Sequence, residues 1–261
     1  MGKVMKAFLI LGVILLVIGL CVFLVGLGLN DWKLSTSYNM ETYTASAKNE
    51  KLDLKMSAGE MNVVFYEGET VQVDYPTSSV RGYTVTEEGG TITVKPIKRF
   101  HVSFFGWDRI PTVTVKVPRG DAMNFKLAMS AGKATIESGS FLNFAVDLSA
   151  GYVKTGEITC ENFDVDMSAG SLTAAVVRTA RADIDLSAGS ASLSSLTADD
   201  ISVDVSAGSV NMNIAGRKAD YTISVKKSAG SCKLTNQTGE VAGKRLDVDL
   251  SAGSVNVTFS D

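Results

Sequence analysis

Aspartate residues recur at one place in a repeated segment of this sequence, and carboxylates at regular spacing could bind a cation. Asp147, Asp166, Asp185 and Asp204 each stand two residues before a Ser-Ala-Gly tripeptide, 19 residues apart. Asp164 and Asp183 stand four residues before the same tripeptide in two of these units, and Asp247 and Asp249 repeat both positions near the C-terminus. Ligands that are all oxygens suit Ca²⁺. Asp147, Asp164, Asp166, Asp183, Asp185 and Asp204 are therefore a candidate Ca²⁺ site.

Two other interpretations of the aspartates stay open. If successive repeats stack about 5 Å apart, each adjacent pair of carboxylates repels by roughly 0.9 kcal/mol even in bulk water. Such a row could be a solvated face that discourages aggregation, or a surface that binds a basic partner. The glycine-rich calcium nonapeptide is absent from the sequence, and a flat strand face coordinates an ion incompletely. Apart from Ca²⁺, the sequence suggests no cofactor.

A second group of residues could make contacts rather than do chemistry. The stretch from Lys95 to Arg109 interleaves basic and aromatic side chains and contains His101, the single histidine. This composition suits an anionic interface such as lipid headgroups, teichoic-type wall polymers or glycans. The same aromatics could instead fold down as a cap. The candidate contact residues are Lys98, Arg99, Phe100, Phe104, Phe105, Trp107 and Arg109.

The sequence lacks the usual catalytic constellations. No phosphate-binding glycine loop is recognisable, and a lone histidine cannot form a histidine-based metal cluster. Cys232 falls in an apolar column and is expected to be buried. We therefore predict that the chain is not an enzyme, with a glycan-active enzyme using stacked aspartates as the alternative. After Lys3 and Lys6, the chain carries 28 acidic and 23 basic side chains, which argues against nucleic-acid binding.

The Ser-Ala-Gly tripeptides themselves predict the fold. Residues one, three and five positions before each tripeptide are mostly apolar, which is the period-two pattern of a strand with one buried face. A repeat near twenty residues indicates stacked units, so we predict an all-β parallel β-solenoid of about eight rungs; an antiparallel sandwich is the rival. Val146, Val165, Ile184 and Val203 should then form one row. The tripeptides begin at Ser57, Ser130, Ser149, Ser168, Ser187, Ser206, Ser228 and Ser251.

The first two tripeptides are 73 residues apart, and this gap predicts an insertion. Alternating stretches around the turn signal Glu88-Gly89-Gly90 indicate a β-hairpin that caps one end of the solenoid. At the other end, the final repeat should form an open outer edge with Val255, Val257 and Phe259. The predicted organisation is a cytoplasmic N-terminus (1–6), a transmembrane helix (7–29), a tether (30–49) and a β-solenoid ectodomain (50–261) with an inserted cap region (67–118).

Residues 7–29 contain no charged side chain and are long enough to cross a bilayer. Lys3 and Lys6 precede them, so the positive-inside rule places the N-terminus in the cytoplasm and the ectodomain outside. The run is too long for an ordinary signal peptide, which is the rival interpretation. Gly12, Gly19 and Gly26 lie on one helix face. Homo-oligomers could form through this stripe or through the C-terminal end of the solenoid.

The apolar N-terminal segment, the inserted segment ending in Thr112–Pro118 and the Asp-Leu-Ser-Ala-Gly-Ser units together resemble a bacterial family. It is the putative-adhesin, β-strand-repeat family of unknown function, found in cell-envelope proteins. The resemblance covers about residues 45–261. It implies a β-solenoid ectodomain in the cell envelope, sometimes associated with envelope-stress signalling, and no catalytic residues. The expected role is a membrane-anchored binding or scaffold module that contacts the membrane, an anionic wall polymer or another envelope protein. The alternative is an adhesin that Ca²⁺ stabilises through the repeated aspartates.

Overall fold

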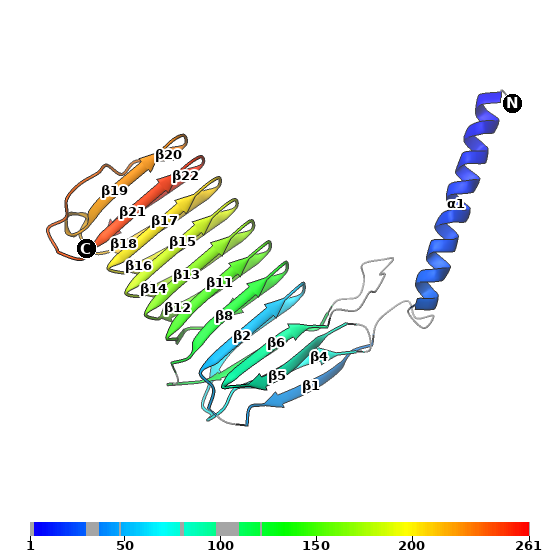
Figure 1. The fold of residues 1–261 in the computed structure, drawn as a ribbon, viewed down its shortest axis with the longest axis horizontal. Coiled ribbons are helices and arrows are strands. Elements are labelled where there is room, and N and C mark those ends of the chain that lie inside the picture. Colours follow the sequence, from blue (N-terminus) through cyan, green and yellow to red (C-terminus); the bar gives the residue numbers. More distant parts are fainter. Residues whose placement is uncertain are drawn as a thin grey trace.

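The computed structural model describes residues 3–29, 37–46, 48–78, 81–97, 110–120 and 122–260. Helix α1 (Lys3–Leu29) precedes a body of strands, and a short 3₁₀ helix, η1 (Lys218–Asp220), lies near the C-terminal end (Figure 1). Within the described residues, no helix combines the length and the apolar character that a membrane crossing requires.

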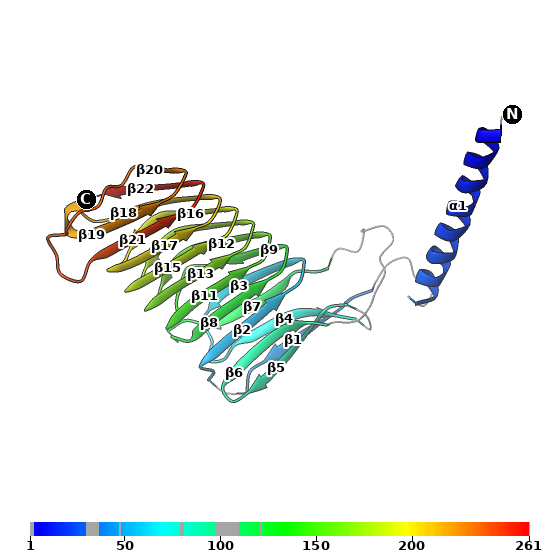
Figure 2. The same cartoon turned by 45° about the horizontal axis from the view of Figure 1, so that its top comes forward.

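The strands form two sheets, and the chain alternates between them as it coils along a common axis (Figure 2). In spatial order, sheet A contains β1 (Asn39–Thr44), β4 (Gln72–Thr77), β7 (Val113–Pro118), β3 (Glu60–Tyr66), β9 (Lys133–Ile136), β12 (Tyr152–Thr159), β14 (Ser171–Arg178), β16 (Ser190–Thr197), β18 (Ser209–Ala215), β22 (Ser254–Ser260) and β20 (Ser231–Cys232), with β10 (Gly139–Ser140) beside β12. In spatial order, sheet B contains β19 (Thr222–Lys227), β21 (Arg245–Leu250), β17 (Asp200–Val205), β15 (Arg181–Leu186), β13 (Asn162–Met167), β11 (Asn143–Leu148), β8 (Asn124–Met129), β2 (Lys51–Met56), β6 (Thr91–Pro96) and β5 (Tyr83–Glu88).

Equivalent side chains of successive coils lie side by side. Val146 pairs with Val165, Val165 with Ile184, and Ile184 with Val203, all in parallel register. All four are buried. The predicted row is therefore confirmed, and with it the solenoid. Because side chains alternate across a strand, this register places every apolar row in the core and every polar row outside.

Aromatic rings fill the core near the middle of sheet B. The rings of Phe125 and Phe144 stack with centroids 4.9 Å apart, and those of Phe144 and Phe163 stack at 5.4 Å. Phe141 lies against the first two at 4.9 and 5.4 Å. Each stacked ring comes from the same position of a different coil, so the repeat builds the stack.

The C-terminal end is ordered differently from the prediction. The final coil, β21–β22, lies between β17–β18 and β19–β20 rather than on the outside (Figure 1). The prediction that the last repeat forms the outer coil is therefore wrong, and Val255 is buried and pairs with Cys232 of β20, whereas Val257 and Phe259 extend past the two-residue β20 and are half-buried. Tyr221, which follows η1, is also buried and donates a 2.7 Å hydrogen bond to the carbonyl of Ala198.

The N-terminal end shows the same exchange of order. β6 and β7 pair in parallel with β2 and β3, so they continue both sheets outward although they follow β3 in the chain. Within the predicted insertion, β5 and β6 form the expected antiparallel hairpin, whereas the parallel continuation was not predicted. β1 and β4 add antiparallel strands to sheet A. β1 lies within the segment that the sequence predicts as a tether.

Glu87, on the outermost strand β5, binds the segment that enters the solenoid. Its Oε2 accepts hydrogen bonds from the Tyr43 hydroxyl at 2.6 Å and from the backbone amide and hydroxyl of Ser46, and its Oε1 accepts one from Asn49 Nδ2 at 2.8 Å. These donors, led by Tyr43, lower the pKa of Glu87 to about 2, and the carboxylate in turn raises the pKa of Tyr43 to about 12.

We expect Glu87→Gln to weaken folding and to change its acid sensitivity. A carboxyl group with a lowered pKa in the folded state stabilises the protein above its ordinary pKa of 4.5, and this contribution is lost as the pH falls toward 2. Urea titrations of wild type should therefore show decreasing stability across this window, and Glu87→Gln should show a flatter profile. Glu88→Gln alters an exposed neighbour and should keep the wild-type profile. Parallel profiles for all three proteins would contradict this role.

Candidate functional site

The aspartates that the sequence singled out form a continuous row on the outer face of sheet B. Asp147, Asp166, Asp185 and Asp204 are in register on successive strands and are exposed. Asp249 pairs with Asp204 because β21 lies next to β17, so five aspartates follow one another. Lys226 on β19 lies beyond Asp249 and ends the row, an order that the sequence did not reveal. We call these five residues the acidic row.

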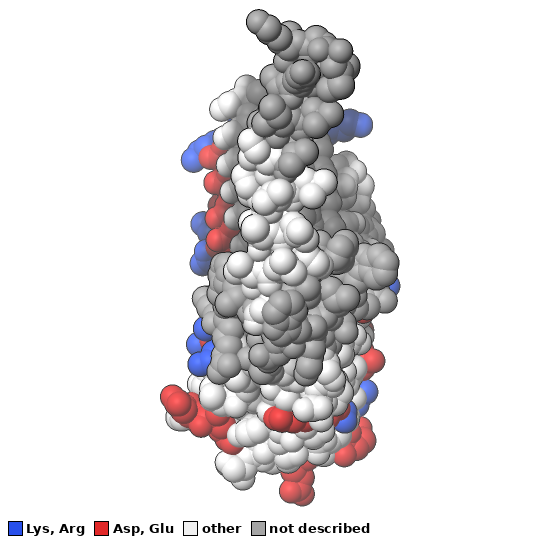
Figure 3. Space-filling view, turned by 90° about the vertical axis from the view of Figure 1, so that its right-hand side faces the viewer, with Lys and Arg blue, Asp and Glu red and all other residues white. Residues whose placement is uncertain are grey.

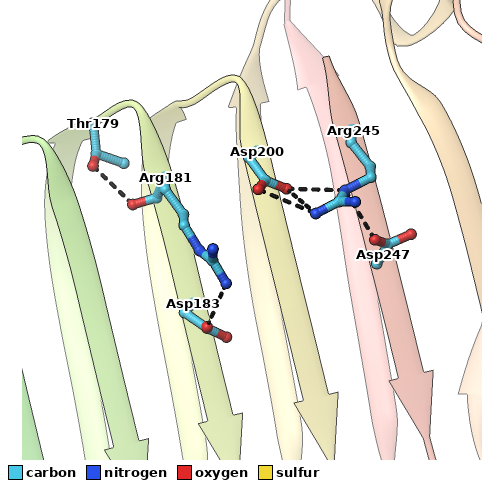
Figure 4. Close-up of polar contacts among 6 residues, drawn as sticks. All are labelled: Thr179, Arg181, Asp183, Asp200, Arg245 and Asp247. Atoms are coloured by element: carbon cyan, nitrogen blue, oxygen red, sulfur yellow. Dashed lines mark hydrogen bonds and ion pairs between the residues drawn. The ribbon is translucent and has the colours of Figure 1, made fainter. Parts of the chain in front are cut away.

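The neighbouring positions on the same face are partly neutralised by arginines. Arg181 contacts Asp183 at 3.3 Å, and Arg245 contacts Asp200 at 3.0 Å and Asp247 at 3.1 Å (Figure 4). Within the described residues, no ion pair involves a member of the acidic row. The row is thus the least neutralised part of this face.

Two aspartates on this face, Asp185 and Asp164, have raised pKa values. Burial, followed by the charges of Asp204 and Asp166, raises the pKa of Asp185. Burial and the charge of Asp183 likewise raise the pKa of Asp164, although Lys126 and Arg181 act in the opposite direction. Burial of these carboxylates, together with the proximity of like charges, therefore opposes folding at neutral pH.

We expect Asp185→Asn to stabilise the folded protein at pH 7 and low salt. Because the pKa of Asp185 is higher in the folded protein than in the unfolded chain, the folded state binds a proton more readily. The contribution of this group to wild-type stability therefore grows as the pH falls through the folded pKa and is lost as the pH rises. The substitution should reduce this gain as the pH falls toward 3.8, the ordinary pKa of an aspartate. Thermal unfolding at 20 and 500 mM NaCl measures both effects, since salt screens the repulsion. Asp183→Asn removes a partner of Arg181 instead, and an equal stabilisation by both variants would contradict the explanation.

The structure gives no further support for a Ca²⁺ site. Among the described residues, no group of three or more His, Cys, Asp or Glu side chains is arranged to hold a metal ion. The row is flat, with one carboxylate from each strand. Cation binding by these aspartates remains a prediction.

The opposite end of the same face is basic. Lys55 is in register with the acidic row and Lys126 with Ala145 and Asp164. Lys51 lies beside Asn124, and Lys95 follows Val94, the partner of Leu54. All four lysines are exposed, and the side chain of Lys55 contacts Asp53 at 3.1 Å. We call Lys51, Lys55, Lys95 and Lys126 the basic end. Sequence reasoning missed it because it depends on the parallel pairing of β6 with β2.

A surface cavity of about 750 Å³ lies at the basic end. Lys55, Lys95, Thr84 and Asp147 contribute to its lining, together with serines from three stacked corners. In the view from the end that carries α1, the charged side chains of the described surface lie at the sides and the lower end (Figure 3). The cavity itself has charged walls, since Lys55, Lys95 and Asp147 line it.

The predicted contact residues Lys98, Arg99, Phe100, Phe104, Phe105, Trp107 and Arg109 lie outside the described residues, as does His101. On either side of them, Ile97 lines the 750 Å³ cavity and Ile110 lines another of about 480 Å³. The contact surface remains a prediction.

The two described cysteines of the solenoid are buried. Cys232 is inward-facing, as predicted, and Cys160 is buried with a pKa that desolvation raises. A buried thiol with a raised pKa is a poor nucleophile. The expectation that the chain is not an enzyme remains a prediction.

Comparison with known proteins finds similar solved structures at low sequence identity. A structure described as a "putative adhesin" from Bacteroides fragilis is 12% identical, with a TM-score of 0.44, covering 87% of this chain and 99% of that one. A "putative cell adhesion protein" from Clostridium sporogenes is 13% identical, with a TM-score of 0.38 and coverage of 86% and 100%. A "putative lipid binding protein" from Parabacteroides distasonis is 12% identical, with a TM-score of 0.43 and coverage of 87% and 96%. No curated protein matches the sequence significantly.

The family model described as Toastrack DUF4097 matches residues 44–261. This match confirms the resemblance to a β-repeat domain family of unknown function that the repeats suggested. Because the matched residues make up most of the sequence, the chain belongs to the Toastrack DUF4097 family.

Proposed function

We propose that this protein is a non-catalytic binding module of the bacterial cell envelope, held at the membrane by its apolar N-terminal segment, residues 7–29. The observation that carries the proposal is the in-register solenoid, whose outer positions repeat from coil to coil. A surface that repeats at the strand spacing of about 4.8 Å suits an extended or repetitive partner better than a single small substrate. Membership of the Toastrack family is consistent with a binding module.

The anchoring part of the proposal rests on the sequence. Residues 7–29 contain no charged side chain and Lys3 and Lys6 precede them, whereas no helix of the described residues meets the requirements of a membrane crossing. The N-terminus would then lie in the cytoplasm and the solenoid outside the membrane. Alkaline carbonate extraction of cell membranes should leave the full-length chain in the pellet, and protease added to spheroplasts should digest the solenoid. Release by carbonate, or a protected solenoid, would contradict the anchor or its orientation.

The partner that we propose is an anionic envelope component, either a wall polymer or a lipid headgroup, contacted by the segment that contains Lys98, Arg99 and Trp107. Residues 95–109 combine four basic with four aromatic side chains, and this composition suits such a partner. An involvement in envelope-stress signalling is part of the same hypothesis and would depend on this contact with the envelope.

Binding is best measured with the full-length chain in neutral phosphatidylcholine nanodiscs. These are mixed with insoluble wall fragments in one arm and with vesicles containing anionic phosphatidylglycerol in the other. We expect sedimentation with at least one of them, and at least a tenfold loss for Lys98→Ala/Arg99→Ala/Trp107→Ala. Lys227→Ala/Lys233→Ala removes two exposed lysines elsewhere and should bind normally. No binding in either arm would reject the proposed partner, and undiminished binding by the triple variant would reject the proposed contact segment.

A further inference from the structure

The outer face of sheet B is electrostatically polarised along the solenoid axis. At one end, β6, β2 and β8 present the four lysines of the basic end and Asp53, a net charge of +3. The next three strands, β11, β13 and β15, present Asp147, Asp164, Asp166, Asp183 and Asp185 together with Arg181, a net charge of −4. Adjacent halves of one flat face thus carry opposite and nearly equal charge.

We propose that this face binds the same face of a second copy of the chain, with the two solenoid axes antiparallel. Parallel, in-register strands arrange equivalent side chains in straight rows across the sheet. A twofold axis parallel to the strands therefore maps each row onto itself in reversed order. With this axis between β8 and β11, β6 faces β15 of the second copy, β2 faces β13, and β8 faces β11.

This arrangement matches opposite charges in the outermost row. Lys95 of each copy meets Asp185 of the other, and Lys55 meets Asp166, so the twofold axis generates four such contacts. All four side chains are exposed in the single chain. Members of the acidic row form no ion pair within the described residues, so the second copy supplies the counter-charges that the fold itself does not.

The second row is compatible with the same arrangement. Lys126 meets Ala145, and Thr93 meets Asp183, without like charges in contact. Asp53 meets Asp164, but its carboxylate is largely covered and already contacts Lys55 at 3.1 Å. The same axis places β5 opposite β17, where Glu88 meets Asp200, a carboxylate that already contacts Arg245 at 3.0 Å. The six central strands give about 1,100 Å² of total contact, at the lower limit for a specific interface. An association that depends on charge and has this area should be weak and sensitive to salt.

Charge reversal tests the pairing directly. Full-length protein in dodecylmaltoside micelles is studied by sedimentation equilibrium between 1 and 100 µM at 50 mM NaCl. We expect a monomer–dimer equilibrium, and an increase of at least tenfold in the dimer Kd for Lys95→Asp and for Asp185→Lys. The double variant Lys95→Asp/Asp185→Lys restores the attraction with reversed polarity and should return to within about threefold of wild type.

Two controls separate this interface from other contacts. Asp249→Lys changes the acidic row beyond the six facing strands and should leave the Kd within about threefold of wild type. Association through α1 would be insensitive to all four variants, and circular dichroism checks that each variant is folded. A monomer at every concentration, equal Kd values for all variants, or failure of the double variant to recover would overturn the proposal. None of these outcomes depends on whether the wall polymer or lipid binds.

Discussion

Gly170→Ala is expected to destabilise the solenoid by about 4 kcal/mol or more, although it adds a single methyl group. Gly170 occupies a corner with φ of +103°, which L-residues rarely adopt. An added Cβ would also lie inside van der Waals contact with the carbonyl oxygen of Gly151 and 2.8 Å from its nitrogen. The backbone of Gly151 cannot move away from this Cβ, because its carbonyl accepts a 2.9 Å hydrogen bond from the Ser171 amide.

Gly120→Ala separates the two causes of this cost. Gly120 also has a positive φ, of +90°, but an added Cβ would meet no atom within 4 Å. Its substitution should cost only the conformational part, about 1–2 kcal/mol. Urea unfolding of both variants measures the difference, which reports the close contact between coils. If the two variants lost equal stability, the coils would be less tightly stacked than the structure describes.

Phe144→Ala should cost about 3–5 kcal/mol, because this ring is at the centre of the aromatic stack. Phe144 is fully buried and contacts Phe125, Phe163 and Phe141, each with ring centroids no more than 5.4 Å away. Truncation removes three aromatic contacts and leaves a cavity that parallel strands with fixed register cannot close. The loss should appear as a lower midpoint in urea with an unchanged slope.

Phe144→Leu is the matched control, because it keeps an apolar side chain of intermediate volume and should cost markedly less. Neither substitution changes the charge of the outer face. An alanine variant as stable as the leucine variant would show that the site collapses around the truncated side chain. The stack would then contribute little beyond its apolar area.

The core of this fold could be predicted from the sequence, because the pattern of each repeat indicates which face of the strand is buried and how successive coils align. Apolar residues at alternate positions identify the buried side, and the glycine corner aligns one coil with the next. Val146, Val165, Ile184 and Val203 form the predicted row for this reason. The register could not be predicted from any single strand; it followed from aligning the copies of the repeat.

The order of the terminal coils could not be predicted, because the coils are nearly equivalent. Leu246, Val248 and Leu250 of β21 suit an inner position as well as an outer one, so hydrophobic pattern does not decide between them. The remaining signal was the spacing of the corners, which departs from 19 residues at the insertion, between Ser206 and Ser228, and between Ser228 and Ser251. Between Ser206 and Ser228 the chain passes over the place that β21–β22 later fills.

The candidate site, like the fold, could be predicted only where it follows from the repeat. The acidic row follows from the repeat, and the structure extends it to Asp249. The basic end did not follow, because Lys95 and Lys55 become neighbours only through the pairing of β6 with β2. Their positions 40 residues apart in the sequence gave no indication of contact. The basic and aromatic residues from Lys98 to Arg109 remain a prediction from composition.

The exchanged coils at both ends determine how a protein of this kind can change in length during evolution. At each end, an outer coil is held by a neighbour that the chain reaches out of order. Duplicating or losing a unit there would disrupt that interlocking, whereas a unit between Ser130 and Ser206 can be gained or lost without reworking either terminus. Homologous domains should therefore differ in the number of their middle repeats and share both ends.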